Sequence, residues 1–412
     1  MRNIAKGMLS FLTANARWLS TGFLLTFASS FGQTWFISLF AGEVRAAHGL
    51  SNGGWGGLYT IATLASAALL FSRGALVDTM RLSRLALLVS LLFALAAGIL
   101  AFSVNVWMLG LGVFLLRFCG QGMFPHMSIT SMGRWFHATR GRAVAIASMG
   151  HPLGEAVLPL IFVALIGGIG WRMAWGVAAG AILIVVIPLL MVLLAQDRQP
   201  SGEAQSPEAS AGLNGAHWTR GMLVRHWLFW AILPLILTPP FIGTVLFFQQ
   251  VNIAEVKGWT LAQMAPGYVF WASVSVVSAL VAGWACDRFG PERLLPLVVV
   301  PMGTALLLLG PAEGYQVWFA VLAIGGVSMG AANAFLGAFL PRVYGTRHLG
   351  AVRSLQTVIM VVSTAIGPGV TGVLIDAGVA FPVQGVGLGL WCLGLSAVMV
   401  PVSLRLAREL RP

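Results

Sequence analysis

The sequence predicts an all-α membrane protein with twelve transmembrane helices, arranged as two parallel repeats of six. Three observations support this fold class: an apolar composition, hydrophobic runs long enough to cross a membrane, and an internal repeat. Of the 412 residues, 58% are hydrophobic and 9% are charged, whereas soluble domains carry about 25% charged residues. Such a chain must face lipid over most of its surface, where only helices and closed barrels satisfy the backbone.

The hydrophobic runs favour helices over a barrel. They are about 18–25 residues long, enough for a helix to cross ~30 Å of hydrocarbon, whereas barrel strands would give alternating segments of ~10 residues. Twelve runs are visible, near 18–41, 55–77, 84–104, 108–132, 143–167, 172–195, 227–250, 266–286, 294–311, 317–341, 352–374 and 384–404.

The second half of the chain repeats features of the first half at an offset of 209 residues, about half the chain length. The matching pairs are Gly74 and Gly283, Asp78 and Asp287, Arg84 and Arg293, Trp135 and Tyr344, Gly141 and Gly350, and Pro159 and Pro368. This pattern indicates an internal duplication. It predicts an N-terminal bundle at 1–195, a flexible linker rich in Ser, Gly, Ala and Glu at 196–225, and a C-terminal bundle at 226–412.

The basic residues lie mainly on one side of the predicted topology. Twenty of the 24 Lys and Arg residues fall in the termini, the linker and alternate loops, while Arg45, Arg172 and Lys257 fall on the other side and Arg117 lies within a span. The positive-inside rule then places both termini and the linker in the cytoplasm, with the spans in a cell (inner) membrane. The net charge of +12 therefore reflects topology, and we expect no nucleic-acid partner.

No cofactor or metal site is expected from the sequence. Cys119, Cys286 and Cys392 fall in or beside apolar runs, without the spacing of metal ligands. A Gly-rich phosphate loop followed by Lys and Ser or Thr is missing from the sequence. A membrane-embedded enzyme or a sensor is an alternative class, but neither a nucleophile beside a base nor a soluble output domain is visible. We therefore predict that the protein is not an enzyme.

Two ionisable residues fall near the middle of the predicted spans, where a charge costs several kcal/mol. Arg117 lies about 12 residues, or ~18 Å, from the outer end of the fourth span, and Glu155 lies equally far from the inner end of the fifth. Consecutive helices are usually neighbours, so a contact between them is expected. Arg117 suits a carboxylate substrate and Glu155 a transported proton. The alternative is a static ion pair, although such pairs stabilise weakly.

Two histidines and six polar residues complete the predicted site. His151 lies one helical turn before Glu155, and His126 lies at similar depth in the fourth span, so both could relay a proton. The alternative is a hydrogen-bonded core histidine at each position. The residues expected to line the substrate cavity are Gln33, Thr34, Tyr59, Gln249, Asn333 and Gln356. Each could instead hydrogen-bond between helices.

The repeated loop has a charge pattern that predicts a gate. Its members are Gly74, Asp78 and Arg84 in the first copy, and Gly283, Asp287, Arg288, Gly290 and Arg293 in the second. An Asp at the end of a span can pair with a basic loop or with the positive end of a neighbouring helix. Such a pair would latch one access state. The alternative is a solvated Asp that anchors the topology.

These motifs resemble the major facilitator superfamily over essentially the whole chain. The second loop copy, from Gly283 to Arg293, is similar to the family's loop signature, whereas the first copy departs from it after Asp78. Arg117 with its following glycines resembles the fourth-helix signature. The fifth span is similar to the antiporter signature through Gly141, Gly150 and Gly154, but Glu155 stands where that signature has a proline. Trp135, Phe136, 140–143 and 150–154 resemble the monocarboxylate and oxalate–formate branch.

The resemblance implies two six-helix bundles with a central cavity, and transport by alternating access. We predict a monomeric secondary transporter that moves a small, monocarboxylate-like organic anion by proton-coupled symport. Its expected partners are the substrate, protons and the lipid bilayer. The alternative is a drug/proton antiporter that exports lipophilic compounds.

Overall fold

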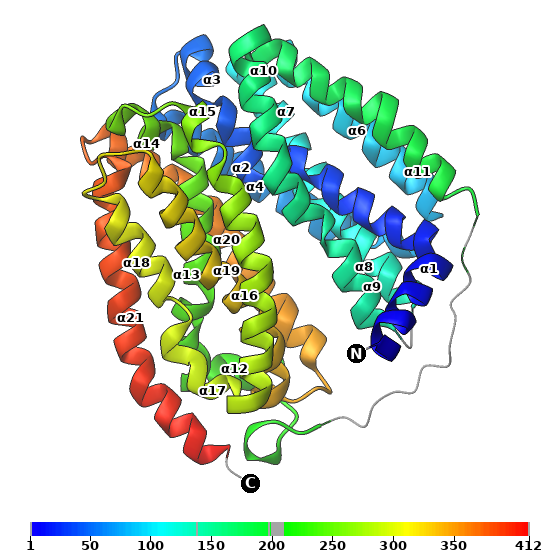
Figure 1. Ribbon diagram of the computed structural model, residues 1–412, viewed down its shortest axis with the longest axis vertical. Coiled ribbons are helices and arrows are strands. Elements are labelled where there is room, and N and C mark those ends of the chain that lie inside the picture. Colours follow the sequence, from blue (N-terminus) through cyan, green and yellow to red (C-terminus); the bar gives the residue numbers. More distant parts are fainter. Residues whose placement is uncertain (1, 137–138, 197, 199–209, 411–412) are drawn as a thin grey trace. The chain divides into compact units, whose positions relative to one another are not determined.

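The protein is all-α in a computed structural model, and the predicted fold class is confirmed (Figure 1). The structure describes residues 2–136, 139–196, 198 and 210–410, so much of the first half of the predicted linker lies outside the described residues. The chain forms two compact units. Unit 1 comprises Met1–His48 and Ile61–Ser206, and unit 2 comprises Gly49–Thr60 and Pro207–Pro412.

Unit 1 holds the first group of helices and the greater part of α4. Its elements are α1 (Arg2–Ala28), η1 (Ser29–Gly32), α2 (Thr34–Ile37), η2 (Ser38–Phe40), α3 (Ala41–His48), α4 (Asn52–Arg73), α5 (Leu76–Thr79), α6 (Leu82–Ala101), α7 (Val106–Leu116), η3 (Arg117–Met123), α8 (Phe124–Trp135), α9 (Arg140–Ser148), α10 (Gly150–Ala181), η4 (Ile182–Val186) and α11 (Ile187–Leu193). Helix α6 packs against α7, α10 and α11.

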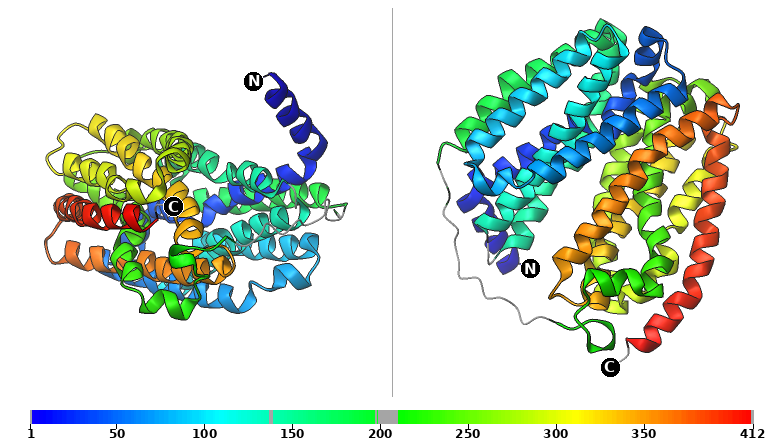
Figure 2. Two further views of the ribbon diagram at one scale, coloured as in Figure 1. Left: turned by 90° about the horizontal axis from the view of Figure 1, so that it is seen from below. Right: turned by 180° about the vertical axis from the view of Figure 1, so that it is seen from behind.

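Unit 2 holds the remaining helices and the first residues of α4. Its own elements are η5 (Leu213–Gly215), α12 (Arg220–Arg225), α13 (Trp227–Phe248), α14 (Gln250–Lys257), α15 (Leu261–Met264), α16 (Gly267–Phe289), α17 (Pro291–Leu294), η6 (Leu295–Leu297), α18 (Val300–Leu309), α19 (Gln316–Tyr344), α20 (Leu349–Asp376) and α21 (Phe381–Glu409). Within this unit α19 packs against α16 and α18, and α13 packs against α20 (Figure 2).

The spans are consistent with the predicted twelve. In the described part of the chain, ten helical stretches are long and apolar enough to cross a membrane, or eleven if Ser10–Gly32 and Thr34–His48, bent by 42°, form one span. One stretch, Arg140–Leu193, has 54 residues, about 80 Å of helix. It contains the non-helical residue Gly170 (φ 79°), and the chain turns back within α10 (Figure 1). This stretch is therefore long enough to cross the ~30 Å hydrocarbon core twice.

Helix α4 is divided between the units, and its start is tied into unit 2. The Asp376 carboxylate at the end of α20 accepts the backbone N–H groups of Asn52 (3.0 Å) and Gly53 (2.8 Å). Farther along α4, the Thr60 hydroxyl donates to the Ala365 carbonyl of α20 at 2.7 Å. Asp376 is thus the N-terminal cap of α4, where a negative charge is favourable.

The segment before α13 is more ordered than its composition predicts. A flexible linker is expected through Arg225, yet the chain from Ser210 onward is fixed to unit 2. The Ser210 N–H donates to the Thr346 hydroxyl at 2.9 Å, and the Trp218 N–H donates to the Tyr344 carbonyl at 3.2 Å. Trp218 is 5% exposed. Burial of this apolar side chain at the end of α19 offsets the loss of chain entropy.

Several basic side chains close the carbonyl ends of helices. Arg172 donates to two carbonyls at the end of α6 (2.7 and 3.1 Å), and Lys257 donates to two just beyond α18 (2.6 and 2.8 Å). Arg17 does the same at the end of α11 (2.7 Å). These carbonyls have no partner within their helix and carry partial negative charge. Two of the three basic residues that the sequence places opposite the arginine-rich side are therefore helix caps.

Candidate functional site

The first span is broken near its middle. Helix α1 ends at Ala28, one short turn follows in η1, and Gln33 is extended (φ −82°, ψ 152°) before α2 begins. The axes of the helical segments before and after the break are bent by 42° relative to each other. A break in a membrane helix leaves backbone carbonyls without their usual N–H partners, and such a break is tolerated where protein or a cavity surrounds it. The break therefore requires nearby donors.

Arg117 supplies donors to this break. Its side chain is 2% exposed, and Nη1 donates to the Gly32 carbonyl (3.1 Å) and the Thr34 hydroxyl (3.3 Å). Arg117 begins η3, a π-helical segment, and widened turns of this kind occur frequently at functional sites. The charged side chain expected at mid-depth thus lies at the point where the first span loses its helical form.

Glycines bring the neighbouring helices close to the break. A Cβ placed on Gly120 of η3 would lie 2.6 Å from the Cα of Gly32, so these two backbones are in contact. On α10, a Cβ on Gly150 would lie 2.7 Å from the nitrogen of Phe27, and one on Gly154 would lie 3.0 Å from the Cβ of Ser30. The glycine spacing noticed in the sequence therefore allows both helices to approach the first span.

Glu155 approaches the same region from α10. Its side chain is 7% exposed and follows Gly154, which touches Ser30. Among the described residues no ion pair joins Glu155 to Arg117, so the contact expected from sequence is not formed in this structure. The buried hydroxyl of Ser30 also finds no hydrogen-bond partner in the described part of the chain. Ser30 lies beside the break and is not among the site residues predicted from the sequence.

The two predicted histidines have different surroundings. His151 is half-buried one turn before Glu155, and its ring meets that of Trp35 with centroids 6.3 Å apart. The Nε2 atom of His126 instead lies 3.1 Å from the Gly74 carbonyl, at the loop that carries the first gating motif. His126 therefore fits the alternative to a proton relay, a histidine that is hydrogen-bonded within the protein. His151 lies on the same helix as Glu155.

The six predicted cavity residues are divided between the two units. Gln33 and Thr34 lie at the break in the first span, with Thr34 bonded to Arg117. The other four belong to unit 2: Tyr59, Gln249, Asn333 and Gln356.

The unit 2 members have the following environments. Tyr59 is fully buried, with its ring centroid 4.8 Å from that of Phe248. Gln249 is 4% exposed and donates through Nε2 to the Thr371 hydroxyl at 2.8 Å. This is a hydrogen bond between helices, the alternative to a role in lining the cavity. Gln356 is buried on α20, and Asn333 is exposed on α19.

The first gating motif forms an exposed ion pair. Asp78 lies 3.7 Å from Nη1 of Arg134, and the side chains are 66% and 55% exposed, so this pair contributes little stability by itself. The same Nη1 donates to the Val77 carbonyl at 2.9 Å. Gly74 accepts from His126, and Arg84 is exposed on α6. The pair with Asp78 thus lies at the surface of unit 1.

The second motif is built around Glu292, an acid that is not among the gate residues predicted from the sequence. Gly290 has a φ of 84°, and a Cβ there would lie 2.8 Å from Cδ of Glu292. Glu292 is 4% exposed and meets Arg342 through two N–O contacts of 3.0 Å. The available signal was a Pro-Glu pair directly after Gly290, which begins α17. The other motif members, Gly283, Asp287, Arg288 and Arg293, are at least partly exposed.

The glycine contact predicts a measurable loss of stability. We expect Gly120→Ala to lower the free energy of unfolding by about 1–3 kcal/mol, because the added methyl group would overlap Gly32. Gly176→Ala in α10 is the matched control, since nothing lies within 4 Å of a Cβ there. Thermal unfolding in detergent checks this. Equal melting temperatures for the two variants would contradict the contact.

No group of three or more His, Cys, Asp or Glu among the described residues is arranged to hold a metal ion. The three cysteines are buried and free. The chemistry of this site is therefore that of a guanidinium, a carboxyl group and hydroxyls placed around a broken helix.

Curated relatives share the sequence at low identity. The chain is 23% identical to a gentisate transporter of Corynebacterium glutamicum, over 75% of this chain and 69% of that protein. It is 25% identical to a phosphoglycerate transporter protein of Salmonella typhimurium, over 51% of this chain and 50% of that protein. It is 30% identical to a cis,cis-muconate transport protein of Acinetobacter baylyi, over 28% of this chain and 26% of that protein.

Solved structures share the fold. A bacterial homologue of the human lysosomal transporter Spinster, in an inward-facing and unoccupied conformation, superposes with a TM-score of 0.66 at 16% identity, covering 96% of this chain and 95% of that chain. The same homologue in its occupied conformation gives a TM-score of 0.63. The family profile described as Major Facilitator Superfamily matches residues 22–368. The chain therefore belongs to the major facilitator superfamily, and it is a multi-pass membrane transporter rather than an enzyme.

Proposed function

We propose that this transporter moves a small carboxylate-bearing organic anion by alternating access and couples its movement to protons. The observation that carries the proposal is the buried guanidinium of Arg117 at the broken first span. A charge at mid-membrane is costly, and such residues in transporters mark substrate and ion pathways. Broken helices likewise occur at transporter binding sites.

The chemistry around Arg117 suits a carboxylate. A guanidinium is always charged and presents a planar fork of donors that matches two carboxylate oxygens. Thr34 adds a hydroxyl, and Gln33 adds an amide at the extended residue of the break. An anion bound here would replace the carbonyl and hydroxyl contacts of Nη1 with charge-assisted hydrogen bonds.

The named cargoes of the relatives support the same class of substrate. Gentisate, cis,cis-muconate and phosphoglycerate differ in shape, but each carries a carboxylate group. The shared feature is the one that a guanidinium recognises. We therefore infer that the substrate carries a carboxylate. The other predicted cavity residues would recognise the rest of the substrate.

Glu155 is the proposed proton carrier. It is buried on α10 near the break, with His151 one turn away on the same helix. An anion arriving near the break would add negative charge, and a like charge favours the protonated form of a carboxyl group. Proton uptake by Glu155 would thus accompany anion binding, which is symport. His151 is the proposed relay, because imidazole exchanges protons near neutral pH.

The arginine-rich loops set the proposed orientation. Twenty of 24 basic residues lie in the termini, the linker and alternate loops. We therefore place both termini in the cytoplasm and the transporter in the inner membrane, acting as a monomer.

An apolar cavity in unit 2 favours a second candidate, the export of lipophilic compounds. This cavity of about 430 Å³ lies between α13, α20 and α21 and is lined by aromatic residues, including Trp230, Phe241 and Trp391. Its polar groups are few, and one of them, the Thr238 hydroxyl, accepts a hydrogen bond from Trp391 at 3.1 Å. Such a lining suits an uncharged, lipophilic solute.

Transport by the purified protein in proteoliposomes separates the two candidates. Under an imposed gradient with acid outside, we expect uptake of at least one carboxylate from a panel of gentisate, muconate, phosphoglycerate and simple monocarboxylates. Uptake should fall when the gradient is collapsed. Efflux of lipophilic dyes without movement of any carboxylate would contradict the proposal and favour the second candidate.

A further inference from the structure

A polar cavity of about 350 Å³ lies where three membrane-spanning segments of unit 1 end. It is lined by the first residues of α6, by Arg134 and Trp135 at the end of α8, and by Leu194 directly after α11. Spans end where the hydrocarbon gives way to the headgroup region. The cavity therefore opens at a membrane surface, and none of its lining residues belongs to the break in the first span.

Three arginines from different segments line this cavity: Arg81, Arg134 and Arg198. No carboxylate is among the described lining residues. Asp78 reaches Arg134 at 3.7 Å, but its side chain is 66% exposed, so it neutralises only part of the charge. This excess of positive charge favours an anion that carries more than one negative oxygen.

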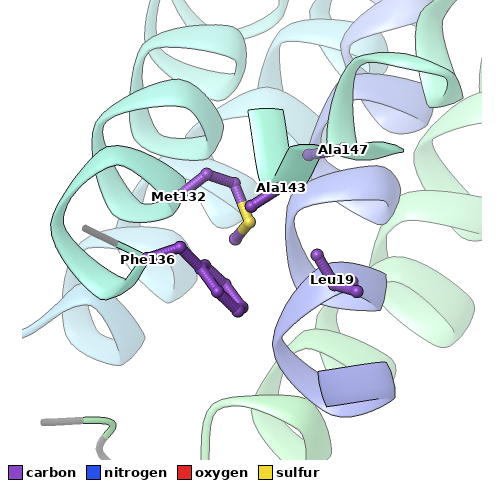
Figure 3. Close-up of a cluster of buried hydrophobic side chains, with 5 residues drawn as sticks. All are labelled: Leu19, Met132, Phe136, Ala143 and Ala147. Carbon is purple, nitrogen blue, oxygen red and sulfur yellow. The ribbon is translucent and has the colours of Figure 1, made fainter. Parts of the chain in front are cut away.

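Arg198 is held in place for such a ligand. Its guanidinium stacks on the rings of Trp18 (4.4 Å) and Phe136 (4.0 Å), and Nη1 donates to the Asn15 side chain at 2.8 Å. Phe136 itself belongs to a buried apolar cluster with Leu19, Met132, Ala143 and Ala147 (Figure 3). An arginine fixed on a rigid base loses less conformational entropy when it binds an anion.

The start of α6 adds further donors. Arg81 occupies the cap position of this 20-residue helix, and no side chain caps it. The first backbone N–H groups of the helix and the positive end of its dipole therefore favour an anion. Thr79 and Ser83, each with a hydroxyl group, are also among the residues that line this cavity.

We propose that this cavity binds a phosphate group, either in the headgroup of an anionic phospholipid or as free phosphate. Arginine forks and backbone N–H groups together match the oxygens of a phosphate. The position at the ends of three spans fits a lipid headgroup, because basic pockets between membrane helices bind anionic headgroups. The proposal concerns a site separate from Arg117 and does not depend on the transported substrate.

Thermal unfolding of the full-length protein in detergent tests the proposal. Phosphatidylglycerol, phosphatidylcholine and inorganic phosphate are added separately to the wild type, Arg81→Gln, Ser83→Asp and Arg84→Gln. Arg81 is exposed, so its variant should fold normally without ligand. We expect phosphatidylglycerol to raise the melting temperature of the wild type and of Arg84→Gln. The apparent affinity for phosphatidylglycerol should fall by about tenfold or more in Arg81→Gln and in Ser83→Asp.

Arg84 provides the matched control, because it lies in the same helical turn and carries the same charge but does not line the cavity. A rise with phosphatidylglycerol alone identifies a lipid headgroup as the ligand, and a rise with inorganic phosphate as well identifies free phosphate. Equal effects of phosphatidylglycerol and phosphatidylcholine without an effect of phosphate would overturn the proposal. Equal losses in Arg81→Gln and Arg84→Gln would also overturn it.

Discussion

Replacing Arg117 with glutamine should reduce uptake of the carboxylate substrate in proteoliposomes by about 30-fold or more. Truncating one partner of a buried, hydrogen-bonded charge pair costs about 2–5 kcal/mol, which corresponds to a loss of this size. Arg117→Lys should recover only a small part of the activity, because lysine keeps the charge but loses the planar fork. Initial rates over a range of substrate concentrations check both variants.

The Arg117 variants need a control for folding, because the side chain also bonds Gly32 and Thr34. Arg408→Gln, at an exposed position of α21, removes the same charge far along the chain from the break and should transport normally. Thermal unfolding and direct substrate binding separate a misfolded variant from one that cannot bind. Saturable uptake by Arg117→Gln with an unchanged KM would show that the substrate does not use this guanidinium.

Replacing Glu155 with glutamine should uncouple transport from the proton gradient. Glutamine has nearly the same shape but cannot carry a proton, so accumulation driven by outside acid should be lost. Exchange of labelled internal substrate for external substrate needs no net proton movement, and it should continue at a rate near that of the wild type. Counterflow and gradient-driven uptake, measured on the same vesicles, check the two halves of this expectation.

The matched control for Glu155 is Glu313→Gln, which neutralises an exposed carboxylate of unit 2 and should leave both assays unchanged. Gradient-driven accumulation by Glu155→Gln at the wild-type level would remove Glu155 from the coupling mechanism. Loss of exchange together with accumulation, in a variant that still unfolds at the wild-type temperature, would assign Glu155 to substrate binding instead.

The fold class could be predicted from composition because membrane burial acts on whole segments. The apolar runs and the repeat at 209 residues depend on many positions, so the prediction of the fold does not depend on the correct interpretation of any single residue. The break in the first span was not predicted, because its run at 18–41 is apolar enough to be taken for one helix. The polar cluster of Ser29, Ser30 and Gln33 was the available signal, but polar residues also occur inside regular membrane helices.

The candidate site was predicted in part. Arg117 and Glu155 were selected because a charge at mid-depth is costly, and this argument needs only the distance along a helix. Their partners depend on which backbones touch, and a linear sequence does not contain that information. The carbonyl of Gly32 and the hydroxyl of Ser30 lie beside this site because glycines allow three helices to approach one another, and only the structure shows these contacts. The pairing of Glu292 with Arg342 was not predicted for the same reason.

The widened turn of η3 and the break in the first span also have a consequence for the evolution of this sequence. The carbonyl of Gly32 needs the guanidinium of Arg117, and the guanidinium needs oxygen atoms in an apolar interior. Neither irregularity is favourable without the other, because a lone buried charge and a lone buried carbonyl are both costly. We therefore expect the two positions to covary among descendants of this chain: a lineage that loses the arginine should also restore a continuous first helix.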